Sequence, residues 1–153
     1  MSQPIENVLH IDPANLRAYS SGLLQGTAYN RMHTQLTRTL IPFGISVPEW
    51  KLLGQVYEHD NLKLNTLAEL LSYDPPMVTK QAKSLEKKSL IKRTQDPKDE
   101  RSKIIAITNE GKQLIEQIEP EVKKTMHQLL NGVSREELLA YIKVLTTIVN
   151  NSH

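Results

Sequence analysis

The sequence contains no cysteine, which excludes disulfides, iron-sulfur clusters, zinc-thiolate sites and thiol redox switches. It has no run of about 18 apolar residues, and its first ten residues lack a basic segment followed by an apolar stretch. We therefore expect a cytoplasmic protein with no membrane partner. Signatures of catalysis are also missing, because there is no Gly-rich phosphate loop, G-x-S-x-G elbow or metal-ligand cluster. An enzyme, a cofactor and a metal site are not expected.

The 153 residues have the composition of one globular unit. Hydrophobic residues make up 39% and charged residues 24% of the chain, which suffices for one core but not for two independent domains. The histidines form neither an HExxH motif nor a pair at i,i+4, so we expect surface or core histidines rather than metal ligands. They are His10, His33, His59, His127 and His153. We predict a single unit over residues 1–153.

The net charge is only +2, but it is distributed unevenly. Residues 80–103 contain nine Lys or Arg and four acidic residues, a net charge of +5, so that the rest of the chain sums to −3. A basic block in an otherwise slightly acidic chain is typical of contact with a phosphate backbone. A solvated helix face followed by a charged turn would give the same count, so the surrounding pattern has to decide.

Helical periodicity and capping signals predict four helices in the first part of the chain. A long helix is expected over residues 13–41, ended by Pro42 and Gly44. Capping boxes beginning at Ser46 and Thr66 predict a second helix and a short third one. Asp74, followed by two prolines, predicts a fourth helix that runs to about residue 88.

The third and fourth helices, joined by a tight turn, match a helix-turn-helix. In the fourth, Val78, Ala82 and Leu85 share one face and should be buried, which leaves a basic and hydroxylated face outward. Two β-branched runs follow at 90–94 and 103–107, separated by a charged turn at 96–100, and they predict a hairpin that serves as a wing.

The last third of the chain returns to helices. Thr108 or Asn109 is expected to cap a helix that contains Pro120 and ends near residues 131–132. A capping box at Ser134 predicts a final helix with seven Leu, Ile or Val residues over 138–149, more than one small domain needs to cover. The fold class is therefore mainly α with a small β-hairpin wing (α+β), a winged helix-turn-helix over 46–108 with helices at both ends.

This order of elements resembles the MarR family of bacterial regulators over nearly the whole chain. Three segments carry the resemblance most specifically: Leu-Glu-Lys-Lys-Ser-Leu-Ile-Lys-Arg at 85–93, Asp-Pro-Lys-Asp-Glu-Arg at 96–101 and Ile-Thr-Asn-Glu-Gly at 107–111. The resemblance implies a sequence-specific, double-stranded DNA-binding regulator, a repressor, that binds a palindromic operator as a homodimer. It also implies that helices 13–41 and 109–150 interlock in the dimer, and that a wing arginine enters the minor groove.

The sequence departs from the family pattern at three places. Ser89 stands where the family usually has the glycine that ends the recognition helix, so a residue with a Cβ must adopt the left-handed conformation or another cap must form. The wing has Glu100 beside Arg101 in place of two adjacent arginines. The recognition helix begins Asp-Pro-Pro-Met at 74–77 rather than with a Ser/Thr-rich turn, which removes hydroxyl donors.

Candidate DNA contacts lie at the start of the recognition helix and on the wing, where base edges and phosphates would be reached. For Arg101 an ion pair with Asp99 that stiffens the hairpin is the alternative, and the two roles are compatible. The candidate DNA-binding residues are Pro76, Met77, Thr79, Lys80, Lys83, Lys92, Lys98, Asp99 and Arg101.

The resemblance also implies a small-molecule site between the dimerisation and DNA-binding parts. Tyr29, His33 and Trp50 are the candidates for this effector pocket, and the effector would be a small aromatic or anionic molecule. Aromatic residues at helix starts usually belong to the core, which is the alternative. Two other functions remain open: a winged helix that binds an acidic protein partner, and an architectural DNA-binding protein without sequence preference.

Overall fold

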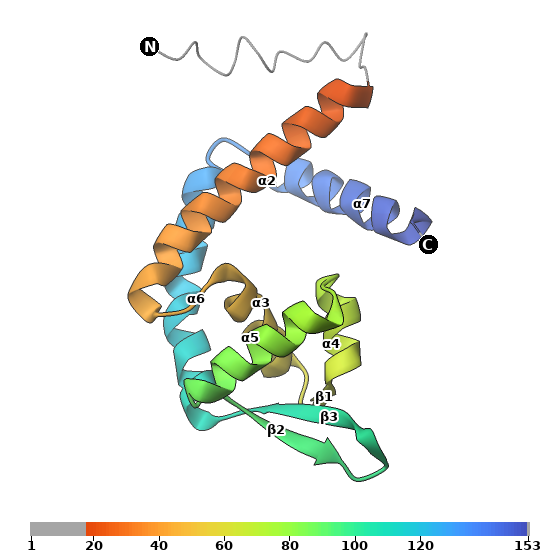
Figure 1. Ribbon diagram of the computed structural model, residues 1–153. Helices are drawn as coiled ribbons and strands as arrows, with labels where there is room; N and C mark the ends of the chain where they lie inside the picture. Colours follow the sequence, from red (N-terminus) through yellow and green to blue (C-terminus); the bar gives the residue numbers. More distant parts are fainter. Residues whose placement is uncertain (1–17, 153) are drawn as a thin grey trace.

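The computed structural model describes residues 18–152, with burial described from residue 22 onward. It is mainly helical with one small antiparallel sheet, which confirms the predicted fold class (Figure 1). The elements are α2 (Ala18–Leu40), the 3-10 helix η2 (Ile41–Phe43), α3 (Val47–Glu58), β1 (Leu62–Lys63), α4 (Leu64–Leu71), α5 (Pro75–Lys87), β2 (Ile91–Asp96), β3 (Asp99–Ile107), α6 (Asn109–Leu129) and α7 (Arg135–Asn151). The predicted start of the first helix, residues 13–17, lies outside the described residues.

Most helix starts follow the predicted capping signals. The Ser46 hydroxyl accepts the Glu49 N–H at 3.2 Å, and the Glu49 carboxylate accepts the Ser46 N–H at 3.1 Å, which makes a complete capping box for α3. The same reciprocal pair forms at Ser134 and Glu137 before α7. These boxes satisfy two N–H groups that the first helical turn leaves without a partner.

The predicted capping box at Thr66 is wrong. Helix α4 begins at Leu64, and its N-cap residue, Lys63, makes no side-chain capping bond. The physical reason is long-range: β1 pairs with β3 in the register Leu62 with Ile105, so the backbone is held extended up to Lys63 and turns directly into the helix. Thr66 therefore lies inside the first turn.

The three strands are ordered β1-β3-β2, and all neighbours are antiparallel. The sequence predicted the β2–β3 hairpin but not the two-residue strand β1. The hairpin is also longer than predicted, because the strands reach Asp96 and Asp99 and leave only Pro97 and Lys98 as the turn. The Asp96 carboxylate accepts the Lys98 N–H at 2.9 Å and so closes this turn.

The core lies beneath α5, between α3, the sheet and α6, and it extends to the end of α2. Val78, Ala82 and Leu85 are completely buried, as the spacing predicted. Leu52, Leu53, Val56 and Leu67 meet them from α3 and α4, and Ile91, Ile105 and Ile118 from the sheet and α6. This one cluster determines the orientation of α5 relative to the other helices and the sheet.

Two backbone positions explain the junction between α5, the wing and α6. Ser89 has φ 61°, so of the two alternatives for this turn the left-handed conformation of a residue with a Cβ is the one that occurs. Gly111, in the first turn of α6, lies so close to the Leu90 carbonyl that an added Cβ would overlap it, and would approach the Ile107 side chain to 2.7 Å. Only glycine fits at 111 without displacement of the wing.

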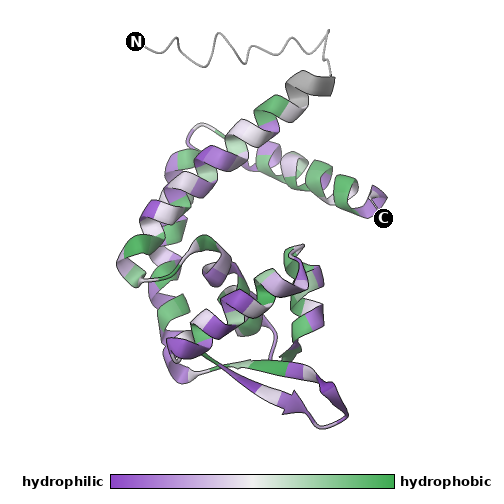
Figure 2. Cartoon of the chain, in the orientation of Figure 1, coloured by the Kyte–Doolittle hydropathy of each residue, from purple (hydrophilic) through white to green (hydrophobic). Residues whose placement is uncertain are grey.

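Helix α6 leaves the winged-helix part and packs against α2, and α7 then turns away toward the C-terminus (Figure 1). Thr108 caps α6, and this helix continues without a break through Pro120. No residue of α7 is buried, although the helix is rich in apolar side chains, visible as green segments in Figure 2. Among the described residues, no helix is both long and apolar enough to cross a membrane.

Candidate nucleic-acid interface

Helices α4 and α5 form the predicted helix-turn-helix. Ser72 ends α4 in the left-handed conformation, with φ 53°, and Asp74 caps α5 by accepting the Met77 N–H at 2.8 Å. The buried side of α5 packs on α3 and α4, so its other side faces outward. Pro76, Lys80 and Lys83 are exposed on that side, whereas Met77 and Thr79 are half-buried.

Five residues of the outward side enclose a shallow hollow at the start of α5. They are spaced at i, i+1, i+4, i+5 and i+8, which places them on one helical face. The lining is formed by Pro75, Pro76, Thr79, Lys80 and Lys83. The predicted contacts Pro76, Thr79, Lys80 and Lys83 are therefore brought together, and Pro75 is added to them.

Two of the nine cations in residues 80–103 are held in ion pairs within the protein. Lys88 pairs with Glu49 at 2.8 Å and Arg93 pairs with Glu86 at 3.0 Å. Within the described part of the chain, the remaining cations of 80–103 form no ion pair within 4.0 Å. These are Lys80, Lys83, Lys87, Lys92, Lys98, Arg101 and Lys103. The structure thus leaves seven positive charges available to phosphates.

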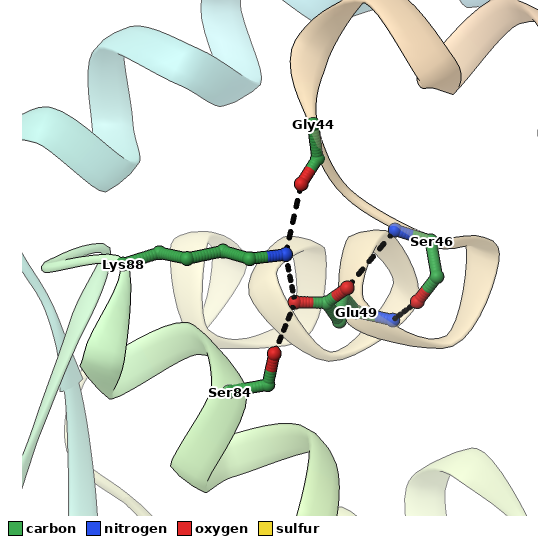
Figure 3. Close-up of polar contacts among 5 residues, drawn as sticks. All are labelled: Gly44, Ser46, Glu49, Ser84 and Lys88. Carbon is green, nitrogen blue, oxygen red and sulfur yellow. Dashed lines mark hydrogen bonds and ion pairs between the residues drawn. The ribbon is translucent and has the colours of Figure 1, made fainter.

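Lys88 closes a polar cluster that joins three segments, which we call the Lys88 clasp (Figure 3). Its ammonium donates at 2.8 Å both to the Glu49 carboxylate and to the Gly44 carbonyl. The same carboxylate oxygen accepts the Ser84 hydroxyl at 3.0 Å, and the other oxygen accepts the Ser46 N–H. The clasp ties the end of α5 to the start of α3 and to the turn after η2.

The Glu49 carboxylate is stable in this position although its side chain is only 8% exposed. Burial by itself pushes the Glu49 pKa upward, because it penalises the charged form. The hydrogen bonds from Lys88, Ser46 and Ser84 and the Lys88 charge outweigh that effect, so the pKa lies below its ordinary value of 4.5. Sequence reasoning missed this cluster, because residues 44, 49 and 88 are distant along the chain.

A second ion pair joins α5 to the wing. The Arg93 guanidinium donates to both oxygens of Glu86, at 3.0 and 3.2 Å, and the Arg93 N–H donates to Glu86 at 3.1 Å. These bonds from Arg93 lower the Glu86 pKa against a smaller opposing effect of desolvation. These bonds tie the recognition helix to strand β2, whereas the clasp ties it to α3 and to the turn after η2.

The wing tip presents Lys98, Asp99, Glu100 and Arg101, all exposed. The Asp99 carboxylate accepts the backbone N–H of Arg101 at 3.0 Å, and in the described residues it forms no ion pair with the guanidinium. The Arg101 side chain therefore extends from a stiffened backbone. Behind the tip, Asp96 is 4% exposed and pairs with Lys63 of β1 at 3.2 Å, which anchors the hairpin to the sheet edge.

The three residues predicted for an effector pocket lie on two helices, Trp50 on α3 and Tyr29 and His33 on α2. Trp50 lines a hollow of about 760 Å³ between α3, α4 and α6, together with Tyr57, Leu70 and Ile115. Tyr29 and His33 lie on α2, with ring centroids 6.0 Å apart, and are not among its lining residues. Carboxylates rim the hollow; the charge of Glu116, with smaller effects from Glu58 and Glu119, raises the Tyr57 pKa.

No group of three or more potential metal ligands occurs among the described residues. The arrangement of the polar groups is instead that of a surface: a recognition helix with an exposed basic side, and a charged wing beside it. This geometry defines a winged helix-turn-helix DNA-binding protein.

Comparison with known proteins identifies the family. The MarR family pattern matches residues 45–103. The HTH-type transcriptional regulator YdgJ of Bacillus subtilis is 32% identical over 108 residues, which cover 71% of this chain and 66% of YdgJ. The HTH-type transcriptional repressor MdtR of the same organism is 28% identical over 111 residues, 72% of each chain.

Solved structures agree with the fold along most of the chain. A MarR-family regulator from Rhodococcus sp. RHA1 superposes with a TM-score of 0.80 at 23% identity, covering 86% of this chain and 93% of that one. The MepR protein of S. aureus, solved in complex with DNA, superposes with a TM-score of 0.77 at 28% identity, covering 85% and 96%. The chain belongs to the MarR family and is a DNA-binding transcriptional regulator.

Proposed function

We propose that the chain is a homodimeric repressor that binds a palindromic operator and is released by a small-molecule effector. It acts by binding and not by catalysis. The observation that carries the proposal is the outward side of α5, with Thr79, Lys80 and Lys83. Beside it lies a wing tip whose Lys98 and Arg101 form no ion pair among the described residues. In helix-turn-helix proteins the first turns of the recognition helix reach the base edges.

The DNA contacts divide by chemistry. Pro76, Met77, Thr79, Lys80 and Lys83 are assigned to the major groove, because they occupy the first turns of α5. Lys92, Lys98 and Asp99 are assigned to the backbone and the wing turn, where phosphate contacts fix the register without reading sequence. Arg101 is assigned to the minor groove, since its side chain leaves a hairpin tip whose backbone Asp99 stiffens.

We also assign separate segments of the chain to DNA binding and to dimerisation. Residues 46–108 form the DNA-binding part, and residues 13–41 and 109–150 the dimerisation helices. Exposed apolar side chains on α7 support the second assignment, because they are 38 to 70% exposed and nothing in the described chain covers them. They are Leu139, Tyr141, Ile142, Val144, Leu145, Ile148 and Val149. We assign a second copy of the chain to this apolar surface, because a two-fold symmetric operator is bound by a two-fold symmetric dimer.

The repressor assignment is supported by similarity to MdtR, which is named a transcriptional repressor. The effector site is assigned to the hollow beside Trp50, because α3 and α4 line it and both pack against α5. Its carboxylate rim favours an aromatic effector over an anionic one. Since Trp50 is the only tryptophan in the chain, its fluorescence would report an occupant of this hollow.

The proposed function is tested by selection of duplexes from a random pool with the purified protein, followed by titrations at two salt concentrations. We expect one palindromic sequence to bind on the order of a thousandfold more tightly than random DNA. Lys92→Ala should weaken all duplexes alike and reduce the salt slope by about one, whereas Thr79→Ala should relax base preference. Arg101→Ala should weaken binding more than either.

Lys124→Ala serves as the matched control, because Lys124 is an exposed lysine on α6 about four turns from the start of that helix. Binding without sequence preference would instead indicate an architectural DNA-binding protein. Absence of salt-dependent duplex binding would indicate a winged helix that meets an acidic protein partner.

A further inference from the structure

We propose that the start of α5 reads thymine through its C5 methyl group, in the hollow lined by Pro75, Pro76 and Thr79. This inference rests on the proposed function, because it requires specific duplex binding, and it adds the chemical class of base that the helix selects. It is carried by the shape and chemistry of the hollow together with the hydrogen-bond inventory of the helix start.

The hollow is mostly apolar although it lies on the basic side of α5. Two pyrrolidine rings and the Thr79 side chain line it, and Lys80 and Lys83 flank it on the next turns. Both prolines are exposed to solvent, so nothing within the described chain covers their rings. In a helix that reaches into DNA, this surface would meet base edges and exclude water from them.

The first three helical residues of α5 have no free N–H group with which to bind a phosphate or a base acceptor. Pro75 and Pro76 occupy the first two helical positions and have no N–H. The Met77 N–H donates to the Asp74 carboxylate at 2.8 Å, and the Val78 N–H donates to the Asp74 carbonyl at 3.2 Å. The first three helical positions, 75 to 77, therefore offer no free donor, and from Val78 onward the N–H groups are used within the helix.

The charge at this end of the helix also opposes phosphate binding. The Asp74 carboxylate lies at the helix start and is exposed, so it offsets the positive end of the helix dipole and repels other anions. Phosphates are better placed near Lys80 and Lys83, one and two turns further along. The apolar hollow is thus left for a group that is neither an acceptor nor an anion.

Thymine supplies such a group in the major groove. Each base pair presents there a different set of acceptors and donors, and only thymine among the four bases presents a methyl group. Thr79 can contribute its methyl group to the same contact, and the flanking lysines can reach phosphates or guanine acceptors on either side. We expect each operator half-site to place at least one thymine against this hollow.

The test replaces thymine by deoxyuridine, which lacks only the C5 methyl group, at each thymine of the selected operator in turn. Loss of one buried methyl group should weaken binding of the parent protein about fourfold at the critical position. The base pairing and the phosphates stay unchanged, so the substitution isolates the methyl contact. Because it is made in the DNA, this part of the test needs no protein variant.

A variant of the hollow then assigns the contact to its residues. A double variant, Pro75→Ala with Pro76→Ala, should lose the sensitivity to deoxyuridine. Pro48→Ala is the matched control, because Pro48 occupies in α3 the same second helical position that Pro76 occupies in α5. The control should keep the fourfold difference between thymine and deoxyuridine. Circular dichroism checks that each variant retains its helix content.

The outcomes separate this inference from the function on which it rests. A protein that selects an operator but binds every deoxyuridine duplex like the parent duplex would refute methyl reading and leave specific recognition intact. Equal sensitivity in the parent and in the double proline variant would also overturn the proposal, because another side chain would then read the methyl group. Failure to select any duplex would instead remove the proposed function itself.

Discussion

The winged-helix part buries its large apolar side chains, whereas the last helix, α7, leaves its own exposed. In the first, Leu53, Leu67 and Leu85 are completely buried, and one cluster joins helices and sheet. Helix α7 has a complete capping box but buries no residue. The comparison teaches that local signals suffice to specify a helix, whereas its place in the fold requires a surface to pack on.

The largest expected effect comes from charges placed on the uncovered helix. Ile142→Asp combined with Leu145→Asp should give a monomer by light scattering at micromolar concentration, because two carboxylates cannot be buried in an apolar interface. Loss of the second half-site contact should weaken operator binding by on the order of a hundred- to ten-thousandfold. Asn65→Asp, at an exposed position on α4 outside the assigned dimerisation helices, should stay dimeric. A dimeric double variant would disprove the assigned interface.

The winged-helix core should respond in another way. Leu53→Ala removes a completely buried side chain and should lower the free energy of unfolding by about 2 to 5 kcal/mol, measured by chemical denaturation. Leu139→Ala, which truncates an exposed leucine of α7, should instead weaken association and leave the helix content unchanged. If both substitutions shift the unfolding midpoint equally at every protein concentration, then Leu139 does not contribute to association as proposed.

A smaller effect is expected at the Lys88 clasp. Because the Glu49 pKa is lowered on folding, the ionised carboxylate contributes stability above the ordinary pKa of 4.5, and this contribution is lost as the pH falls through the lower folded pKa. Glu49→Gln should remove this part of the acid dependence of unfolding. At pH 7 it should cost on the order of 1 to 2 kcal/mol, since Lys88 is partly screened by solvent.

Lys88→Met provides the comparison, because it leaves the Glu49 charge buried with only Ser46 and Ser84 as donors. It should destabilise the protein more than Glu49→Gln at neutral pH. Equal stability of the parent and both variants between pH 4 and 7 would show that the clasp contributes nothing to folding.

The smallest effect is a gain in stability at Ser89. Its φ of 61° is unfavourable for a residue with a Cβ, so Ser89→Gly should raise the free energy of unfolding by up to about 1 kcal/mol. Ser102→Gly, in strand β3, is the control and should lower stability. A loss of stability in Ser89→Gly would mean that the residue's side chain stabilises the turn.

Local signals in the sequence were enough for the caps at Ser46, Asp74 and Ser134 and for the buried face of α5. Each of these depends on residues within one or two helical turns. The start of α4 could not be predicted, because the pairing of β1 with β3 depends on residues about 40 positions apart. The same holds for Lys88, which counted as one of nine basic residues until the fold brought it to Glu49.

For the candidate site, the sequence located the outward residues of α5 but not their grouping into a hollow with Pro75. It also expected Tyr29, His33 and Trp50 to share one pocket. The sequence could not show that Trp50 lines a hollow with residues of α4 and α6, or that the Lys51 ammonium lies 5.7 Å from the Tyr29 ring on α2. The shared pocket stays a prediction. The assignments at the site remain predictions for the titrations above to test.

The Lys88 clasp has a consequence for the geometry of the operator. The clasp joins the end of the recognition helix to the turn that follows α2 and η2. In the proposed dimer, this connection would hold the two recognition helices at a fixed separation and angle. One base pair inserted between the half-sites displaces the second by about 3.4 Å and rotates it by roughly 35°. A dimer with its recognition helices at a fixed separation would therefore discriminate against operators of the wrong spacer length as well as of the wrong base sequence.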